Sequence, residues 1–188
     1  MNISFGKKIP IMQCQVQNIK TKNFVPSTVY EYDCEDKKDA ENINQIEGYW
    51  LFKPQMYFLA LDKHCQPKKY KDSKIYSLET SNGNTLGMMI LVKDGNNNNV
   101  DLIETRYLCG HKYVGKTLLA AAAKETLKQG YDKLKINQPI QDVRSFYIDG
   151  CGFKETDGRP LEMDDKDLIS FIENTEKAVH TSFIDLQG

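Results

Sequence analysis

Apolar and polar residues alternate over residues 9–19, where Met12, Cys14 and Val16 are separated by glutamines. Successive side chains of a strand point to opposite faces of a sheet, so this alternation is typical of a half-buried strand. We therefore predict the first strand of the fold at residues 9–19.

Residues 20–73 have a less regular pattern. Pro26 and Ser27 predict a loop, because both residue types are frequent in turns and proline lacks a backbone donor. The composition of residues 36–46 and 55–65 predicts two helices.

From residue 74 onward, the pattern predicts an antiparallel meander. Residues 75–81, 85–94 and 100–108 are rich in apolar residues, and the turn-forming sequences SNGN and DGNNNN lie between them. The four consecutive asparagines at 96–99 predict a polar hairpin tip, because asparagine tolerates turn conformations.

The second half of the chain predicts helices separated by short strands. Leucine and alanine residues at helical spacing predict a helix over residues 110–130, with Gly130 at its C-terminal cap. Asp142 predicts the start of a second helix and Gly150 predicts its end. The remaining predicted elements are strands at 132–136, 153–156 and 159–163 and an amphipathic helix over 164–183.

The composition argues against several classes of protein. The 188 residues suit one domain with a substantial core, since 40% of them are hydrophobic. Lys and Arg number 25 against 26 Asp and Glu, so the chain lacks the basic excess that nucleic-acid binding requires. No apolar run suits a signal peptide or reaches the roughly 18 residues of a membrane span. We expect a cytoplasmic protein with no nucleic-acid or membrane partner.

The cysteines bear on disulfides and metals. The sequence contains five, an odd number, and they are widely spaced and never form a CxxC pair. This spacing favours reduced thiols over a disulfide framework or a zinc site, and we expect no bound metal.

Candidate chemistry begins with GHKYVGKT, residues 110–117, which lies between a predicted strand and the strongest predicted helix. Free backbone N–H groups and the helix dipole favour an anion there, so we expect phosphate binding. The string matches GxxxxGK[ST], in which Lys116 would contact the phosphates of a nucleotide and Thr117 would hold magnesium. The context argues against this interpretation, because the preceding strand ends a hairpin meander and too little chain follows for a parallel nucleotide-binding sheet.

The same segment resembles the acetyl-CoA pyrophosphate loop of the GNAT superfamily, whose pattern is [Q/R]xxGx[G/A] between the fourth strand and the third helix. HKYVGKTLLAAA is similar to this landmark, and Gly115 matches the pattern whereas Gly110 and Tyr113 depart from it. A second segment, SFYIDGCGFKE at 145–155, resembles the superfamily's FYxxxGFxE, with one extra residue after Tyr147. The usual asparagine before this landmark is replaced by Ile140. The resemblance implies an α/β (α+β) fold with a mixed, mostly antiparallel central sheet flanked by helices.

The resemblance also implies an activity, which is transfer of acetyl from acetyl-CoA to an amine by direct attack in a ternary complex. Main-chain groups of Ile103, Glu104 and Thr105 would pair with the pantetheine arm. Tyr147 would contact the cofactor and protonate the departing thiolate. Glu104 or Asp101 would accept the amine proton or attract a cationic acceptor. The residues that would hold the diphosphate are His111, Lys112, Tyr113, Val114, Gly115, Lys116 and Thr117.

We interpret residues 1–188 as a single GNAT-like domain. Residues 1–73 would form the acceptor side, 74–163 the acetyl-CoA-binding core and 164–188 the C-terminal helix. A protein N-terminus, lysine, polyamine or aminoglycoside would each suit as acceptor, and the oligomeric state is open. Two alternatives remain, which are a catalytically inactive GNAT-like acyl-CoA-binding or interaction module and a P-loop-type nucleotide-binding protein.

Overall fold

The alternating pattern at the start of the chain produces two paired strands. The computed structural model describes residues 8–32, 38–39, 73–106, 109–158 and 160–187. Strand β1 (Ile9–Asn18) confirms the first prediction and pairs antiparallel with β2 (Phe24–Tyr32). The helices predicted over 36–46 and 55–65 lie outside the described residues, apart from 38–39.

The loop predicted at Pro26 and Ser27 is wrong, because both residues belong to β2. The ladder between β2 and the next strand begins at Ser27 and Thr80, so Pro26 lies just outside it. Its carbonyl oxygen accepts a hydrogen bond from Ser81 N at 3.3 Å. Proline is tolerated at such a position because its missing donor is not needed by that ladder.

The predicted meander is confirmed as β3 (Ser73–Thr80), β4 (Thr85–Asp94) and β5 (Asn97–Thr105). The asparagine run is not a hairpin tip, because the turn is made by Gly95 and Asn96 and the other three asparagines begin β5. The Asn98 side chain is buried and donates to Thr126 Oγ1 at 3.1 Å and to Gln129 Oε1 at 3.3 Å. These helix partners, which the sequence pattern did not reveal, satisfy the buried amide.

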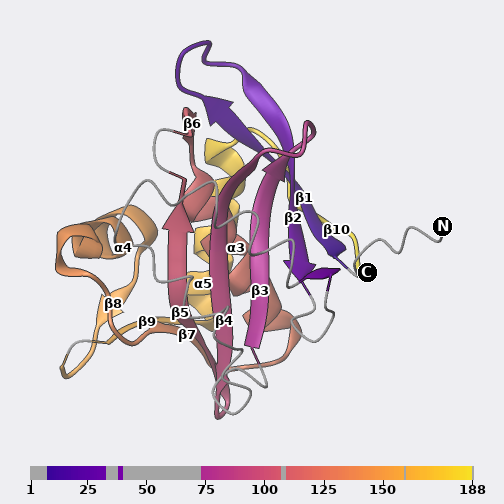
Figure 1. Ribbon diagram of the computed structural model, residues 1–188. Coiled ribbons are helices and arrows are strands. Elements are labelled where there is room, and N and C mark those ends of the chain that lie inside the picture. Colours follow the sequence, from indigo (N-terminus) through magenta and orange to yellow (C-terminus); the bar gives the residue numbers. More distant parts are fainter. Residues whose placement is uncertain (1–7, 33–37, 40–72, 107–108, 159, 188) are drawn as a thin grey trace.

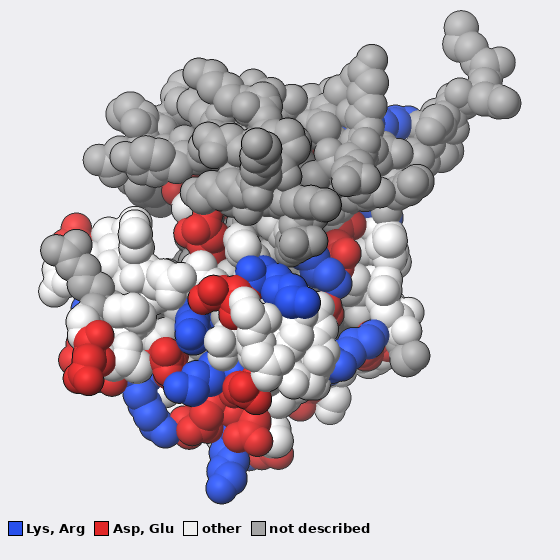
Figure 2. All heavy atoms as spheres, turned by 90° about the horizontal axis from the view of Figure 1, so that it is seen from below, with Lys and Arg blue, Asp and Glu red and all other residues white. Residues whose placement is uncertain are grey.

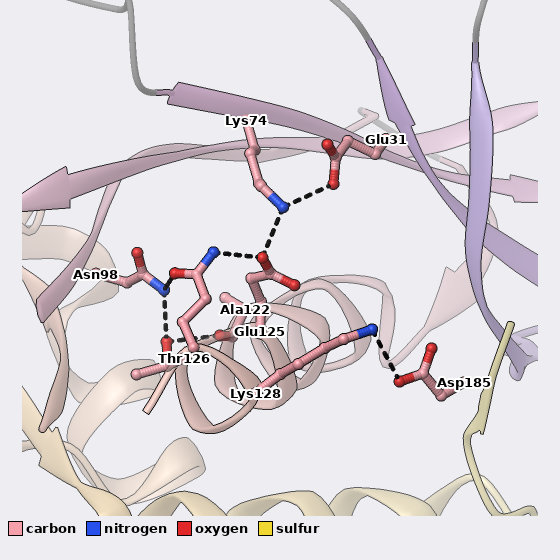
Figure 3. A network of polar contacts seen from close by, with 9 residues as sticks. Glu31, Lys74, Asn98, Ala122, Glu125, Thr126, Lys128 and Asp185 are labelled. Atoms are coloured by element: carbon pink, nitrogen blue, oxygen red, sulfur yellow. Dashed lines mark hydrogen bonds and ion pairs between the residues drawn. The ribbon is translucent and has the colours of Figure 1, made fainter. Parts of the chain in front are cut away.

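A network of polar contacts extends from Asn98 across the interface between sheet and helix (Figure 3). Lys74 Nζ lies 2.6 Å from Glu125 Oε1 and 3.2 Å from Glu31 Oε2. A separate ion pair of the same helix joins Lys128 Nζ to Asp185 Oδ2 at 3.7 Å. Together these contacts connect one helix to four strands.

The helix of this network is α3 (Val114–Lys128). Gly130, which has a φ of 65°, directly follows its C-terminal cap and ends the helix as predicted. The helix begins later than residue 110, because His111–Lys112 form strand β6 paired with β1. Gly110 and Tyr113 both have φ of 70°, which is incompatible with a helix.

The chain after α3 forms β7 (Lys133–Ile136), the 3₁₀ turn η1 (Gln141–Val143) and α4 (Arg144–Cys151). Two predictions about α4 are wrong. Asp142 lies in η1 and does not cap α4, whose N-cap is Val143 without a side-chain bond. Gly150 lies inside α4, and the helix ends at Gly152, whose φ of 86° makes the left-handed stop.

The remaining elements follow the predicted order. They are the strands β8 (Lys154–Glu155) and β9 (Leu161–Asp164) and the helix α5 (Asp165–Ala178). Asp164 caps α5 by accepting a hydrogen bond from Asp167 N at 3.1 Å, which lowers the pKa of the Asp164 carboxyl. A short strand that was not predicted, β10 (Ile184–Asp185), then pairs with β1.

The described strands form one sheet in the order β10-β1-β2-β3-β4-β5-β7-β9-β8, with β6 also paired to β1. Neighbours are antiparallel except for β5 and β7. Helices α3 and α5 cover one face of the sheet, and α4 lies beside β5 (Figure 1). The fold class predicted from the sequence is therefore confirmed. None of the described helices has the length and apolarity needed to cross a bilayer.

Gly87 in β4 permits the close approach of α3. A Cβ at this position would lie 2.7 Å from Val114 Cγ1, 2.9 Å from Leu118 Cδ1 and 3.0 Å from Glu104 O.

We expect Gly87→Ala to lower the free energy of unfolding by about 1–3 kcal/mol in urea denaturation, because the core cannot absorb a methyl group without shifting. Adding Val114→Ala should restore part of this loss. An unchanged stability for the single variant would contradict the close approach.

Candidate active site

The sheet opens between β5 and β7. Only Asn97–Asn99 of β5 pair with β7, at Lys133–Lys135, although β5 continues to Thr105. Just beyond β7, Asn137 N donates to the Asn99 side chain at 3.1 Å, so a side chain takes the place of the ladder. No described strand pairs with β5 on this side after Asn99.

A β-bulge lies where the two strands separate. Val100 is opposite Leu91 and Leu102 is opposite Ile90, which leaves Asp101 as the extra residue. Bulges bend a strand and interrupt its ladder. The bulge therefore turns the second half of β5 away from β7, and a wedge opens between these two strands inside the sheet.

The loop before α3 is fixed beside this wedge. Gly110 O accepts a hydrogen bond from Ile19 N at 2.8 Å, and β6 pairs with the end of β1. His111 Nδ1 lies 2.6 Å from Cys109 O. The loop is therefore held by β1 and by its own backbone.

The first turn of α3 offers donors to an anion. Its first intrahelical bond runs from Thr117 N to Tyr113 O at 2.8 Å, so the N–H groups of Val114, Gly115 and Lys116 precede the hydrogen-bonded helix. The Tyr113 side chain makes no capping bond, and this turn contains no acidic residue. Three N–H groups at the positive end of a helix dipole are suited to bind a negatively charged group.

Three elements converge at Gly115. A Cβ on Gly115 would lie 3.5 Å from Phe146 Cζ and 3.8 Å from Thr105 Cγ2. The Phe146 ring also packs against Gly150, where a Cβ would lie 3.5 Å from Cδ2. Phe146 is 37% exposed and thus forms part of the surface between α3 and α4. Sequence reasoning placed Phe146 beside Tyr147 without a role in the site, because its contact with Gly115 joins residues far apart in the chain.

Tyr147 lies deeper than Phe146. Its side chain is 7% exposed, and its ring centroid lies 5.3 Å from that of Phe146 and 6.1 Å from that of Phe153, both at edge-on angles. Burial, with a smaller contribution from Cys151, raises the pKa of the Tyr147 hydroxyl to about 12. The hydroxyl therefore remains protonated at neutral pH.

The two candidate carboxylates differ in environment. Glu104 is half-buried and lies opposite Met88 in β4, whereas Asp101 is exposed at the bulge. Strict alternation along a strand would place these two side chains on opposite faces of the sheet, but the bulge at Asp101 interrupts that alternation. Of the other candidates, Ile103 packs against the core, and Lys112 is exposed.

Comparison with known proteins rests on structure. No family model matches the sequence, and no curated protein matches it. A GNAT-family acetyltransferase from Staphylococcus aureus has 12% identity and a TM-score of 0.54, with 74% of this chain and 99% of that chain covered. Mutant forms of the spermidine/spermine N-acetyltransferase SpeG from Vibrio cholerae have 14% identity and a TM-score of 0.54. This match covers 77% of this chain and 96% of the SpeG chain.

The fold is that of the GNAT superfamily. This confirms the fold expected from the two sequence landmarks, without identifying a subfamily. The structure places the first landmark in β6 and the first part of α3, and the second in α4 and β8.

The GNAT fold does not favour the P-loop interpretation of residues 110–117. In that interpretation Thr117 would hold magnesium, but its side chain is 0% exposed and faces the interior. The strand before the loop belongs to an antiparallel meander, and its parallel contact with β7 is limited to three residue pairs.

On the face shown in Figure 2, acidic and basic side chains are interspersed without a broad patch of one sign. The described residues contain no group of three or more His, Cys, Asp or Glu that could hold a metal ion.

Proposed function

We propose that this protein is an N-acetyltransferase that transfers acetyl from acetyl-CoA directly to an amine. One observation carries the proposal, which is that β5 beyond its ladder with β7 lies beside the first turn of α3, where a Cβ on Gly115 would be 3.8 Å from Thr105 Cγ2. An extended thioester arm fits along the first feature, and a diphosphate fits the second.

The pantetheine arm would lie along β5. The ladder to β7 ends at Asn99, so Ile103, Glu104 and Thr105 lie beyond it, where the arm would pair like an added strand. The bulge at Asp101 directs this edge into the wedge. A backbone N–H of β5 would then stabilise the oxyanion that forms on the thioester carbonyl.

The diphosphate would lie at residues 111–117. The N–H groups of Val114, Gly115 and Lys116 would donate to its oxygens, and Gly115 would allow close approach because it has no side chain. Lys112 and Lys116 would add positive charge. His111, Tyr113 and Thr117 would position the backbone, with Thr117 anchoring the helix through its burial.

In the reaction, the neutral amine attacks the thioester carbonyl, a C–N bond forms and the C–S bond breaks. Glu104 or Asp101 would accept the proton lost by the amine, directly or through water. Tyr147 would donate its proton to the departing thiolate, and solvent would restore it. The burial that raises the Tyr147 pKa also disfavours a thiolate beside it, so proton transfer would accompany bond cleavage.

The acceptor would be a cationic amine, because the candidate residues near β5 are carboxylates. The spermidine/spermine activity named for SpeG is consistent with such an acceptor. The three described cysteines, Cys14, Cys109 and Cys151, are free thiols, which is in keeping with a cytoplasmic protein.

The first prediction separates cofactor binding from fold. Gly115→Glu should weaken acetyl-CoA binding by at least about tenfold in calorimetric titration, because a carboxylate would occupy the anion site. Its thermal stability should be retained, since an acidic residue in the first turn complements the helix dipole. Gly115→Ala is the matched control and should bind far better, because its Cβ would make only ordinary contacts.

Ligand binding by the wild-type protein distinguishes the proposed acetyltransferase from the two alternative functions. Acetyl-CoA should raise its melting temperature, and Mg-ATP should not. Stabilisation by Mg-ATP alone would contradict the proposal. Binding of acetyl-CoA without coenzyme A release across a panel of amines would identify an inactive acyl-CoA-binding module instead.

The second prediction concerns the acid. Tyr147→Phe should lower kcat for coenzyme A release by about 10- to 100-fold, because the thiolate would lose its proton donor, while acetyl-CoA affinity should change little. Tyr131→Phe is the control, since Tyr131 lies at the other end of α3, where Lys93 Nζ is 5.5 Å from its ring. Equal turnover of the two variants would remove Tyr147 from the mechanism.

A further inference from the structure

A second charged site lies on the sheet face opposite α3. The α3 face carries Val29, Leu78 and Met89, which belong to the helix-packed core. Residues that alternate with these along β2 and β3 point the other way, and they include a buried carboxylate, Glu79, which is 5% exposed. We call Glu79, Ser77, Tyr30 and Tyr32 the Glu79 site.

Two hydroxyl groups of the sheet hold the Glu79 carboxylate. Glu79 Oε1 accepts from Tyr32 OH at 2.8 Å and from Ser77 Oγ at 2.7 Å. Burial, followed by the nearby Glu79 charge, raises the pKa of Tyr32 above its usual value, so this hydroxyl stays protonated and keeps donating. The strands alone therefore orient the carboxylate, and its second oxygen remains for another donor.

That donor is the ammonium group of Lys8, which precedes β1. Lys8 Nζ lies 2.5 Å from Glu79 Oε2, 4.0 Å from the Tyr30 ring centroid and 5.6 Å from the Tyr32 ring centroid. A carboxylate combined with aromatic rings is the chemistry that selects an alkylammonium ion. The Lys8 side chain is 28% exposed, whereas that of Glu79 is only 6% exposed, so Lys8 reaches a buried carboxylate from a partly exposed position.

The Glu79 site shares its sheet face with Glu104. Tyr30, Ser77, Met88 and Glu104 are directly opposite one another across β2, β3, β4 and β5, and therefore point to the same side. Glu79 lies two residues farther along β3, so the backbones of Glu79 and Glu104 are about 12 Å apart, as judged from strand spacing and rise. A cation held at Glu79 is thus on the side from which an acceptor would approach β5.

We propose that the Glu79 site binds a primary alkylammonium group of the amine acceptor, and that Lys8 occupies this site as an intramolecular competitor. The assignment to the acceptor rests on the proposed acetyltransferase function, whereas the site itself does not. Because Lys8 is tethered next to β1, its effective concentration is on the order of millimolar, and acceptor binding has to overcome it.

Chemical rescue tests the site without acetyl-CoA. Lys8→Ala keeps Cβ and removes the side chain from Cγ to Nζ. Butylamine supplies these four atoms and one further carbon, so its ammonium group and chain should fill the space that the variant vacates. We expect butylamine to raise the melting temperature of Lys8→Ala by several degrees, saturating with a Kd of about 1 mM, and to leave wild type almost unchanged. Butanol has the shape of this ligand without the charge and should not rescue.

Matched variants show whether the effect is specific. Lys133→Ala removes a lysine that also lies 2.5 Å from a glutamate oxygen, that of Glu162, but without a surrounding ring pair among the described contacts. Butylamine should not rescue this variant. Tyr30→Leu in the Lys8→Ala background should weaken the rescue at least about threefold by removing the ring beneath the ammonium. Equal responses of Lys8→Ala and Lys133→Ala would overturn the proposal, as would rescue by butanol.

Steady-state kinetics tests the assignment to the acceptor. With saturating acetyl-CoA and diaminobutane as acceptor, Lys8→Ala should lower KM several-fold with little change in kcat, whereas Lys133→Ala should change neither. An unchanged KM together with successful butylamine rescue would refute the acceptor role. Absence of any turnover would refute the proposed acetyltransferase function. Butylamine rescue would then still test whether the Glu79 site binds an ammonium group, because it needs no turnover.

Discussion

The separation of β5 from β7 is the constraint on which the rest of this site depends. A parallel ladder that stops after three residue pairs exposes one edge of a strand in the middle of a sheet. Buried backbone donors and acceptors have to be paired or solvated, so such an edge persists only where another group can reach it. The Asn99 side chain closes the ladder at Asn137, and the bulge at Asp101 turns the remaining edge outward.

Two glycines adjust the surroundings of this edge. Gly87 lets α3 approach β4 until Val114 and Leu118 nearly touch its backbone, which brings the first turn of α3 to the wedge. Gly115 then keeps that turn open and leaves space between Thr105 and Phe146. The absence of a side chain at Gly87 in β4 therefore sets the position of α3, and its absence at Gly115 keeps the N–H groups of the first turn accessible.

These features explain how much the sequence could predict. The meander, α3 and the Gly130 stop were predicted, because their signals are local and the packing agrees with them. Pro26 and the asparagines after Asn96 were misassigned to turns, because pairing partners distant in sequence override local turn preference. In the site, Gly115 was found from a motif, whereas the contact of Phe146 with Gly115 joins residues far apart in the chain and has no sequence signal.

The sheet also separates the two charges that the proposed reaction brings together. The anionic cofactor would be held on the α3 side, where the helix dipole and lysines favour negative charge. The cationic amine would be attracted on the opposite face, where Glu79 and Glu104 share a side of the sheet. Only a strand that leaves its neighbour lets a thioester from one side meet an amine from the other. In the proposed reaction the β5–β7 wedge would supply that opening, whereas a closed sheet with the same side chains would keep the thioester and the amine apart.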